Sequence, residues 1–205
     1  MEIIFTDNNG NILTEKQKQF TDSYIKVYKE NNRLRKEEYY DENNLTNTFY
    51  YIEFGESHQN LLELNLDKIS INEIEDINLN FIKYHHYGYY QGILKSKGLE
   101  VRANNNFILM SQELNILTNL PNYNKTYKFY EDKNNGYEFE FKYYPSGELA
   151  SVRVSNDAIS FYEQYRSSEL DLIHNFEWWN QYSSYYLNAE PAVPKDIEII
   201  INKNQ

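Results

Sequence analysis

The sequence predicts an α+β protein made mainly of antiparallel β-meanders, with one long C-terminal helix packed on a sheet face. Residues 137–143 alternate strictly between aromatic and charged side chains, which is typical of a strand with one buried and one wet face. Residues 169–187 place large apolar side chains at helical spacing, which predicts a helix with a core-facing stripe. Turns rich in Asn and Gly separate several shorter alternating segments, as expected for meanders.

The N-terminal part of the chain predicts a strand, a helix and a three-stranded antiparallel meander. Residues 2–6 form the strand, and Thr14 is placed to cap a short helix over 14–22. Asparagine-rich turns separate the meander strands, which we expect over 23–29, 33–40 and 46–54. Residues 1–55 are a candidate meander subdomain within a single compact domain of residues 1–205.

The rest of the chain is less regular. Residues 56–78 mix helical and strand spacing, and they predict a short helix with irregular connections. Residues 80–94 predict a long strand or a hairpin broken near Gly88, and residues 100–110 predict another strand or pair. A second meander is expected over 126–131, 137–143 and 149–155, then the helix over 169–187, and a final strand over 197–201.

The composition favours a basic protein as the binding partner and disfavours nucleic acid. The chain has 21 tyrosines, no cysteine and a formal net charge of −11. Acidic proteins repel phosphates, so we expect no nucleic-acid partner and favour a basic protein partner. The absence of cysteine excludes thiolate ligands and thiol nucleophiles. The 28 asparagines also fit an AT-rich coding sequence, so codon bias is an alternative explanation for part of the tyrosine excess.

We expect neither a leader peptide nor a membrane partner. The first ten residues, MEIIFTDNNG, lack a basic n-region and an apolar h-region. No apolar run approaches the roughly 18 residues that a membrane-spanning helix needs. The sequence therefore predicts a cytoplasmic protein.

Three segments share a tyrosine, a turn residue and a leucine at fixed spacing. They are YKENNRL from Tyr28, YYDENNL from Tyr39 and YYPSGEL from Tyr143. In each segment an aromatic residue at the end of a strand is followed by a turn residue that tolerates positive φ. The pattern resembles the MORN-type hairpin repeat, in the divergent form found in bacterial toxin–immunity loci, although two copies carry Asn where that repeat usually has Gly. The resemblance implies a non-enzymatic binding module, often an antitoxin or immunity protein, with no catalytic residues.

Motifs for catalysis or cofactor binding are missing. The chain has no G-x-S-x-G, Walker A, G-x-G-x-x-G or H-E-x-x-H motif. His85 and His86 are adjacent in a predicted strand, so they point to opposite faces. His174 and Glu177 share a helix face but lack a third ligand at suitable spacing. Nearby carboxylate pairs fit acid–base chemistry, and they fit a solvated face equally well. We therefore predict no metal and no cofactor.

Two features are candidate partner-binding surfaces. Residues 53–80 carry seven acidic residues and one lysine. This acidic stretch is either a docking surface for a basic partner or a solvated face. The aromatic stripe of the predicted C-terminal helix is either core or an exposed anchor patch. The candidate partner-binding residues are Glu63, Asp67, Glu73, Glu75, Asp76, Trp178, Tyr182 and Tyr185.

These observations favour a non-enzymatic acidic binding protein. The leading hypothesis is an immunity protein or antitoxin that neutralises a basic toxin enzyme by direct protein–protein binding. An alternative is a small-ligand or carbohydrate-binding module that uses the faces of Tyr and Trp rings. A third hypothesis is an enzyme of unrecognised type, which requires a cleft with converging polar groups.

Overall fold

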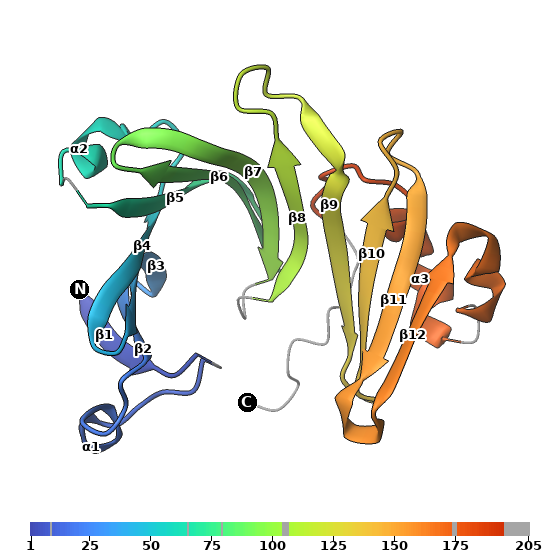
Figure 1. The fold of residues 1–205 in the computed structure, drawn as a ribbon, viewed down its shortest axis with the longest axis horizontal. Helices are drawn as coiled ribbons and strands as arrows, with labels where there is room; N and C mark the ends of the chain where they lie inside the picture. Colours follow the sequence, from blue (N-terminus) through green and yellow to red (C-terminus); the bar gives the residue numbers. More distant parts are fainter. Residues whose placement is uncertain (9, 65, 79, 104–106, 174–175, 195–205) are drawn as a thin grey trace. The chain divides into compact units, whose positions relative to one another are not determined.

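A computed structural model of the protein describes residues 1–8, 10–64, 66–78, 80–103, 107–173 and 176–194 (Figure 1). Within these residues twelve β strands are hydrogen-bonded in the order of the sequence, from β1 to β12. β4 and β5 pair in parallel, and the other pairs with a described register are antiparallel. The strands are β1 (Glu2–Thr6), β2 (Tyr24–Glu30), β3 (Arg33–Asp41), β4 (Asn44–Ile52), β5 (Lys68–Ile77), β6 (Phe81–Tyr90), β7 (Ile93–Ala103), β8 (Ile108–Leu114), β9 (Pro121–Asp132), β10 (Tyr137–Tyr143), β11 (Leu149–Asn156) and β12 (Phe161–Arg166).

The helices in the described part of the chain are all short. They are α1 (Glu15–Lys18), α2 (Gln59–Leu62) and α3 (Glu177–Tyr186), with the 3-10 helices η1 (Asp157–Ile159) and η2 (Ser167–Leu172). The predicted α+β class, with antiparallel meanders and a long C-terminal helix on a sheet face, is therefore wrong. The residues that the structure describes form a mixed twelve-stranded sheet with short helices.

Tertiary packing explains why no long helix covers residues 169–187. Phe176 has an extended backbone with φ −87° and ψ 123°, so helical structure does not continue through it. Its ring packs edge-on against Tyr137 at 5.4 Å and Phe139 at 5.0 Å. The apolar spacing identified residues that face a core, but it could not reveal this break. The predicted strand over 197–201 lies outside the described residues.

The N-terminal meander is confirmed. β2, β3 and β4 pair antiparallel, and Asn31 and Asn32 turn with φ values of 51° and 62°. Positive φ at both central residues is the geometry of the tight type I′ hairpin. Gln91 and Gly92 make the same kind of turn between β6 and β7, with φ values of 49° and 72°. The predicted break near Gly88 is therefore wrong, because Gly88 lies inside β6.

The strand β5 was missed because its alternating pattern is short and lies in a stretch of mixed apolar spacing. Residues 68–72 alternate between polar and apolar side chains, but Glu73 and Ile74 break the pattern. Ile69, Ser70, Ile71 and Asn72 are at most 8% exposed, so both faces of this part of β5 are buried. Since β5 runs parallel to β4, the chain between them crosses from one end of the strand pair to the other. Residues 53–67 make this connection and contain the predicted short helix, α2. We call residues 53–67 the crossover segment.

The chain divides into two compact units. The first unit is Met1–Glu75 and His85–Lys97, and the second is Asp76–Tyr84 and Gly98–Gln205. In the first unit Ile52, Ile69 and Ile71 form a small core cluster, and leucines of the crossover segment pack against it. The second unit has a larger aromatic core, in which α3 contributes Trp178, Trp179, Tyr182 and Tyr186.

The second meander, β9–β11, forms the sheet side of that aromatic core and is confirmed as antiparallel. Phe139 and Phe141 of β10 are buried, as their strict alternation predicted. The ring of Phe141 stacks on Trp179 at 5.8 Å and on Tyr186 at 4.3 Å. Ten residues of helix are therefore enough to cover this part of the sheet with aromatic side chains.

Candidate functional site

The predicted aromatic stripe lies in the core of the second unit. Trp178 and Tyr182 are each 7% exposed, and the Trp178 ring stacks on Tyr130 at 3.9 Å. The hydroxyl of Tyr185 is buried without a hydrogen-bond partner among the described residues, and burial raises the pKa of this side chain. In this conformation the three predicted anchors supply packing area inside the unit and little exposed contact area.

Buried hydrogen bonds fasten the end of α3 to the sheet. Lys128 on β9 is 1% exposed, and its ammonium donates to the carbonyl oxygens of Tyr185 at 2.6 Å and Asn188 at 2.8 Å. Tyr143 donates to the carbonyl oxygen of Tyr186 at 2.9 Å. Both side chains satisfy carbonyl groups that a helix end leaves open. Burial lowers the pKa of Lys128 to about 7.

The predicted acidic residues divide into a paired group and a free group. Glu75 lies 3.2 Å from the Nε2 atom of His85. Glu63, Asp67 and Asp76 are exposed and make no ion pair with another described residue. Glu63 and Asp67 belong to the crossover segment of the first unit, whereas Asp76 belongs to the second unit.

Glu73 holds the crossover segment against β5. One carboxylate oxygen accepts the backbone N–H of Gly55 at 2.8 Å, and the other lies 3.8 Å from His58. The Nδ1 atom of His58 lies 3.1 Å from the Tyr89 hydroxyl, and its ring packs edge-on against Tyr87 at 4.7 Å. Burial lowers the pKa of His58, although the charge of Glu73 acts in the opposite direction. Glu73 was predicted to contact a partner. In the structure it contacts Gly55 and His58 and so helps to hold the crossover segment in place.

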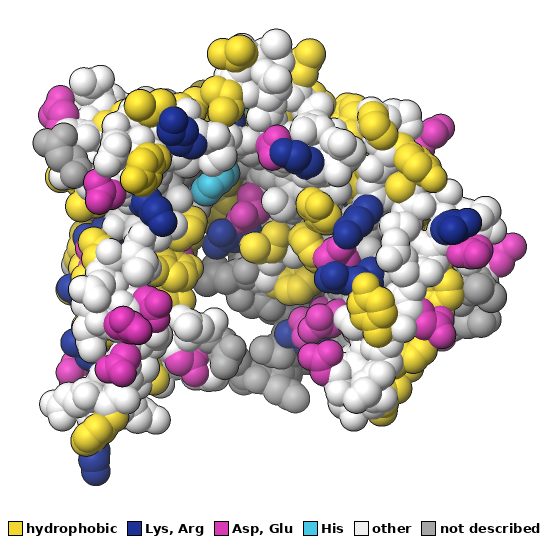
Figure 2. Space-filling model, in the orientation of Figure 1, with side chains coloured by type: hydrophobic (Ala, Val, Ile, Leu, Met, Phe, Trp, Pro, Cys, Tyr) yellow, Lys and Arg dark blue, Asp and Glu magenta, His cyan; other side chains and the backbone are white. Residues whose placement is uncertain are grey.

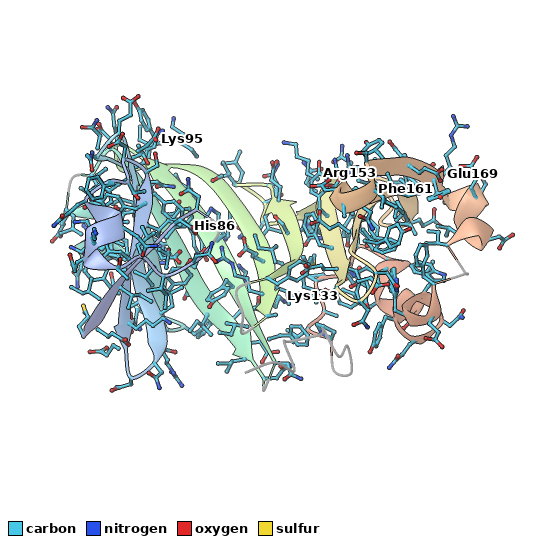
Figure 3. The ribbon with its side chains drawn as sticks, turned by 90° about the horizontal axis from the view of Figure 1, so that it is seen from below. His86, Lys95, Lys133, Arg153, Phe161 and Glu169 are labelled. Atoms are coloured by element: carbon cyan, nitrogen blue, oxygen red, sulfur yellow. The ribbon has the colours of Figure 1, made fainter. Side chains whose placement is uncertain are left out.

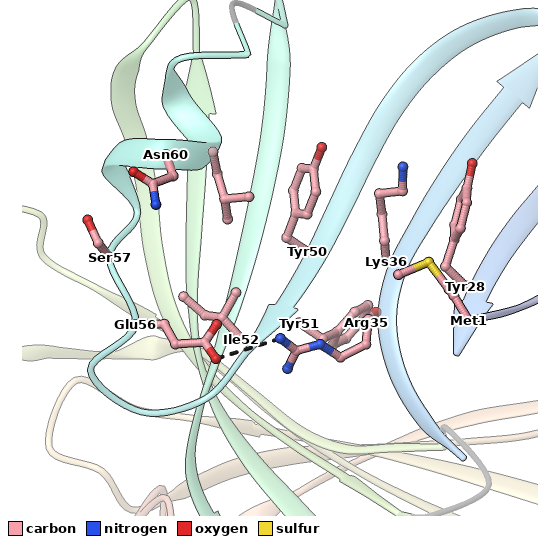
Figure 4. Close-up of a pocket in the computed structure, with 11 residues that line it drawn as sticks. Met1, Tyr28, Arg35, Lys36, Tyr50, Tyr51, Ile52, Glu56, Ser57 and Asn60 are labelled. Atoms are coloured by element: carbon pink, nitrogen blue, oxygen red, sulfur yellow. Dashed lines mark ion pairs between the residues drawn. The ribbon is translucent and has the colours of Figure 1, made fainter. Parts of the chain in front are cut away.

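The first unit also has a pocket of about 520 Å³ beside the crossover segment (Figure 4). Strands β2, β3 and β4 supply one side of it, and residues 56–61 supply another. The strand register places Tyr28, Lys36 and Tyr50 next to one another on these three strands. The remaining lining residues are Met1, Arg35, Tyr51, Ile52, Glu56, Ser57, Asn60 and Leu61.

Hydrogen bonds between tyrosines and a carboxylate order one side of the pocket. Glu38 accepts from Tyr28 at 2.7 Å, from Tyr40 at 3.2 Å and from the Lys36 ammonium at 2.7 Å. Burial opposes ionisation of Glu38, but these donors together lower its pKa. Burial and the charge of Glu38 raise the pKa of Tyr40 to about 12. At neutral pH the carboxylate is therefore charged and the tyrosines are neutral donors.

Buried polar side chains also form pairs across the strands of the first unit. Glu37 is 8% exposed and accepts from the Tyr51 hydroxyl at 2.7 Å. Asn72 is fully buried, and its Oδ1 atom lies 2.8 Å from the Nδ1 atom of His86, which Figure 3 labels. Sequence reasoning missed both pairs, because their partners come from different strands and no local spacing indicates them.

The histidines of β6 face opposite sides, as predicted, because His85 lies against Glu75 while His86 lies against Asn72. His174, from the other predicted histidine pair, lies outside the described residues. Within the described ranges no group of three or more His, Cys, Asp or Glu side chains is arranged to hold a metal ion. In the same ranges no helix has the length and apolar character needed to cross a membrane.

No protein-family model, no curated protein and no solved structure matches this chain. The resemblance to the MORN-type hairpin repeat therefore stays a prediction.

Proposed function

We propose that the protein is a non-enzymatic binding protein of the immunity or antitoxin kind, which docks on a basic toxin enzyme through the crossover segment. The exposed side chains of this segment that the proposal uses are the crossover patch. They are Phe54, Glu56, Glu63, Leu64 and Asp67.

The observation that carries the proposal is the exposure of large apolar side chains beside free acids. Phe54 is 75% exposed and Leu64 is 52% exposed, while Glu63 and Asp67 are exposed without an ion pair among the described residues. Acidic and hydrophobic side chains both lie at the upper left of Figure 2, where Figure 1 places α2. An apolar anchor with a charged rim is the usual anatomy of a protein–protein interface.

The segment is also held in place before any partner arrives. The contacts of Gly55 with Glu73, and of His58 with Glu73 and Tyr89, hold the stretch between Phe54 and α2. Preorganisation lowers the entropy that a binding loop loses on association. It supports a role as a ready docking surface.

The sign of the charge supports a basic partner. Residues 53–67 contain four acidic residues and no lysine or arginine, within a chain of net charge −11. Such a field speeds the approach of a basic protein and disfavours acidic ones. Basic nucleases and similar enzymes, which must attract phosphate, fit this description.

The test is protection from a toxin together with direct binding. The chain is used to capture partners from the producing cell, and each basic protein recovered is expressed with and without the chain. The proposal expects one of them to be toxic alone, to be neutralised by the chain, and to bind less tightly as salt rises.

Matched variants locate the surface. Phe54→Ala should weaken binding about tenfold or more, since exposed aromatic anchors often contribute more than 1 kcal/mol. Glu63→Lys should slow association, whereas Glu138→Lys, at an exposed acid on β10 of the second unit, should have a much smaller effect. Failure to recover a toxic basic protein, or equal effects of Glu63→Lys and Glu138→Lys, would contradict the proposal.

A further inference from the structure

We infer that the pocket of the first unit binds a neutral, polyhydroxylated ring, such as a free monosaccharide or the terminal sugar of a glycan. This activity differs from docking through the crossover patch, although Glu56 belongs to both the patch and the pocket lining. It uses the residues that line the pocket between β2–β4 and α2 (Figure 4).

The size and walls of the pocket suit a small ligand. Its volume of about 520 Å³ lies within the range of small-ligand sites, about 300–1,000 Å³. Ile52 is 6% exposed and forms part of a core cluster against which Tyr50 and Leu61 pack. These side chains give the pocket an apolar wall supported from behind, as ligand sites require.

Only one of the two aromatic rings beside Lys36 has a face open to a ligand. The Lys36 ammonium lies 4.0 Å from the centroid of the Tyr28 ring, so a cation already covers that face. Tyr50, on the other side of Lys36, makes no such contact among the described residues. A sugar ring has one apolar C–H face, which can stack on a single aromatic ring. A flat aromatic ligand binds best when it stacks between two rings.

The charges in the pocket are compensated in pairs. Lys36 lies 2.7 Å from Glu38, and Arg35 lies 3.6 Å from Glu56, the pair marked by the dashed line in Figure 4. An anionic or cationic ligand would have to displace one of these partners and leave a charge unpaired. A neutral ligand has no such cost, and its hydroxyl groups can use the remaining donors and acceptors of the pairs.

Three polar groups at the pocket remain available to hydroxyls. The Tyr50 hydroxyl and the Asn60 amide make no hydrogen bond with another described residue, and the Ser57 hydroxyl accepts one bond from the Gln59 backbone at 3.2 Å. Burial, with the charge of Glu38, raises the pKa of Tyr50, so its hydroxyl stays protonated. Each of these groups can both donate and accept, and sugar hydroxyls present the same combination.

The experiment is an NMR titration of the full isotope-labelled chain. Glucose, galactose and N-acetylglucosamine are the neutral probes, and sialic acid and inorganic phosphate are the charged probes. We expect at least one neutral sugar to shift the signals of Tyr50, Asn60 and Leu61, with a Kd of about 1 mM or tighter. A glycan array then separates the two sources: binding of array glycans well above that of monosaccharides identifies a terminal sugar, and equal binding identifies the free sugar.

Variants with matched controls make the result specific. Tyr50→Ala should weaken sugar binding about tenfold or more, and Asn60→Ala should weaken it several-fold. Tyr144→Ala and Asn124→Ala, at exposed positions of the second unit, should leave it unchanged. Thermal unfolding of each variant separates lost binding from lost structure.

Three results would overturn the inference. They are the absence of shifts with every neutral probe, stronger binding of the charged probes, and equal losses in the pocket and control variants. Sugar binding that survives Phe54→Ala would separate this site from the docking surface, so either proposal can fail without the other.

Discussion

In the first unit, tyrosine hydroxyls donate to carboxylates, whereas in the core of the second unit they donate to backbone carbonyls. Tyr28 and Tyr40 bind Glu38 beside the pocket, while Tyr143 and Tyr186 bind the carbonyl oxygens of Tyr186 and Phe129. The tyrosines beside the pocket therefore bind a carboxylate, and those in the second core hold the backbone. Outside that core, Tyr123 and Tyr165 of the second unit also donate to carboxylates. The first unit carries the pocket and the crossover patch, and the second carries the large aromatic core.

The largest expected effect tests whether the aromatic core of the second unit stabilises the protein. Phe141 is fully buried, and Phe141→Ala should lower the free energy of unfolding by about 3–5 kcal/mol. Phe54→Ala removes the same side chain from an exposed site of the first unit and should change stability by no more than about 0.5 kcal/mol. Urea unfolding of both variants makes the comparison, and similar losses would refute the contrast.

The next prediction concerns Lys128. Its pKa is lowered from 10.5 to about 7 in the folded protein, so between these values the unfolded chain binds more protons. Stability should therefore rise from about pH 7 to pH 9, with a slope of at most about 1.4 kcal/mol per pH unit. Below about pH 7 Lys128 is protonated in both the folded and the unfolded state. The cost of burying its charge then lowers the free energy of unfolding by its full amount.

Lys128→Met removes this titration, so its stability should be flatter than that of the wild type over the same pH range. The control is Lys142→Met, at a half-exposed lysine of β10 that is paired with Glu140, which should keep the rise. Unfolding in urea at several pH values measures both variants. If Lys128→Met keeps the full rise, the buried ammonium is not its source.

A smaller effect is expected in the tyrosine–carboxylate network of the first unit. Glu38→Gln removes a charge that helps to raise the pKa of Tyr40 from 10.0 to about 12. The pKa should fall part of the way back, because burial, the larger cause, remains. NMR of tyrosine labelled at the hydroxyl-bearing carbon measures it. Glu138→Gln in the second unit should leave the Tyr40 pKa unchanged, and an equal shift there would count against the network.

The smallest effect on folding is predicted for the crossover patch. Glu63→Gln should change stability by no more than about 0.5 kcal/mol, because the side chain is exposed. Association with a basic partner should nevertheless slow and become less dependent on salt. Stopped-flow binding at two salt concentrations tests this, and a large loss of stability would show that Glu63 has a structural role.

Strands with one apolar and one polar face were predicted correctly from the sequence. The prediction failed where tertiary packing, and not the local spacing of apolar residues, decides the conformation. Strict alternation located β10 and its neighbours, and Asn-rich turns located the first meander. The long helix failed because the ring of Phe176 packs on β10 in an extended conformation. The strand β5 was missed because its short alternation breaks at Glu73 and Ile74.

The candidate site was predictable only in part. The sequence identified the acidic residues of the crossover segment, because charge is a property of each residue. It could not tell free acids from paired ones, since Gly55 and His58 reach Glu73 through tertiary structure. The pocket had no local signature either, because it depends on the register that aligns Tyr28, Lys36 and Tyr50 across three strands.

The central proposal is that a basic partner docks on the first unit and not on the second. Its most direct test is carboxyl-to-lysine cross-linking of the chain in its producing cell, mapped by mass spectrometry. A basic partner that docks on the first unit should be joined to the chain through Glu56, Glu63 or Asp67. Glu138 of the second unit, an exposed acid outside the crossover patch, should carry few such links. Cross-links concentrated on acids of the second unit, or none to any basic protein, would contradict the account.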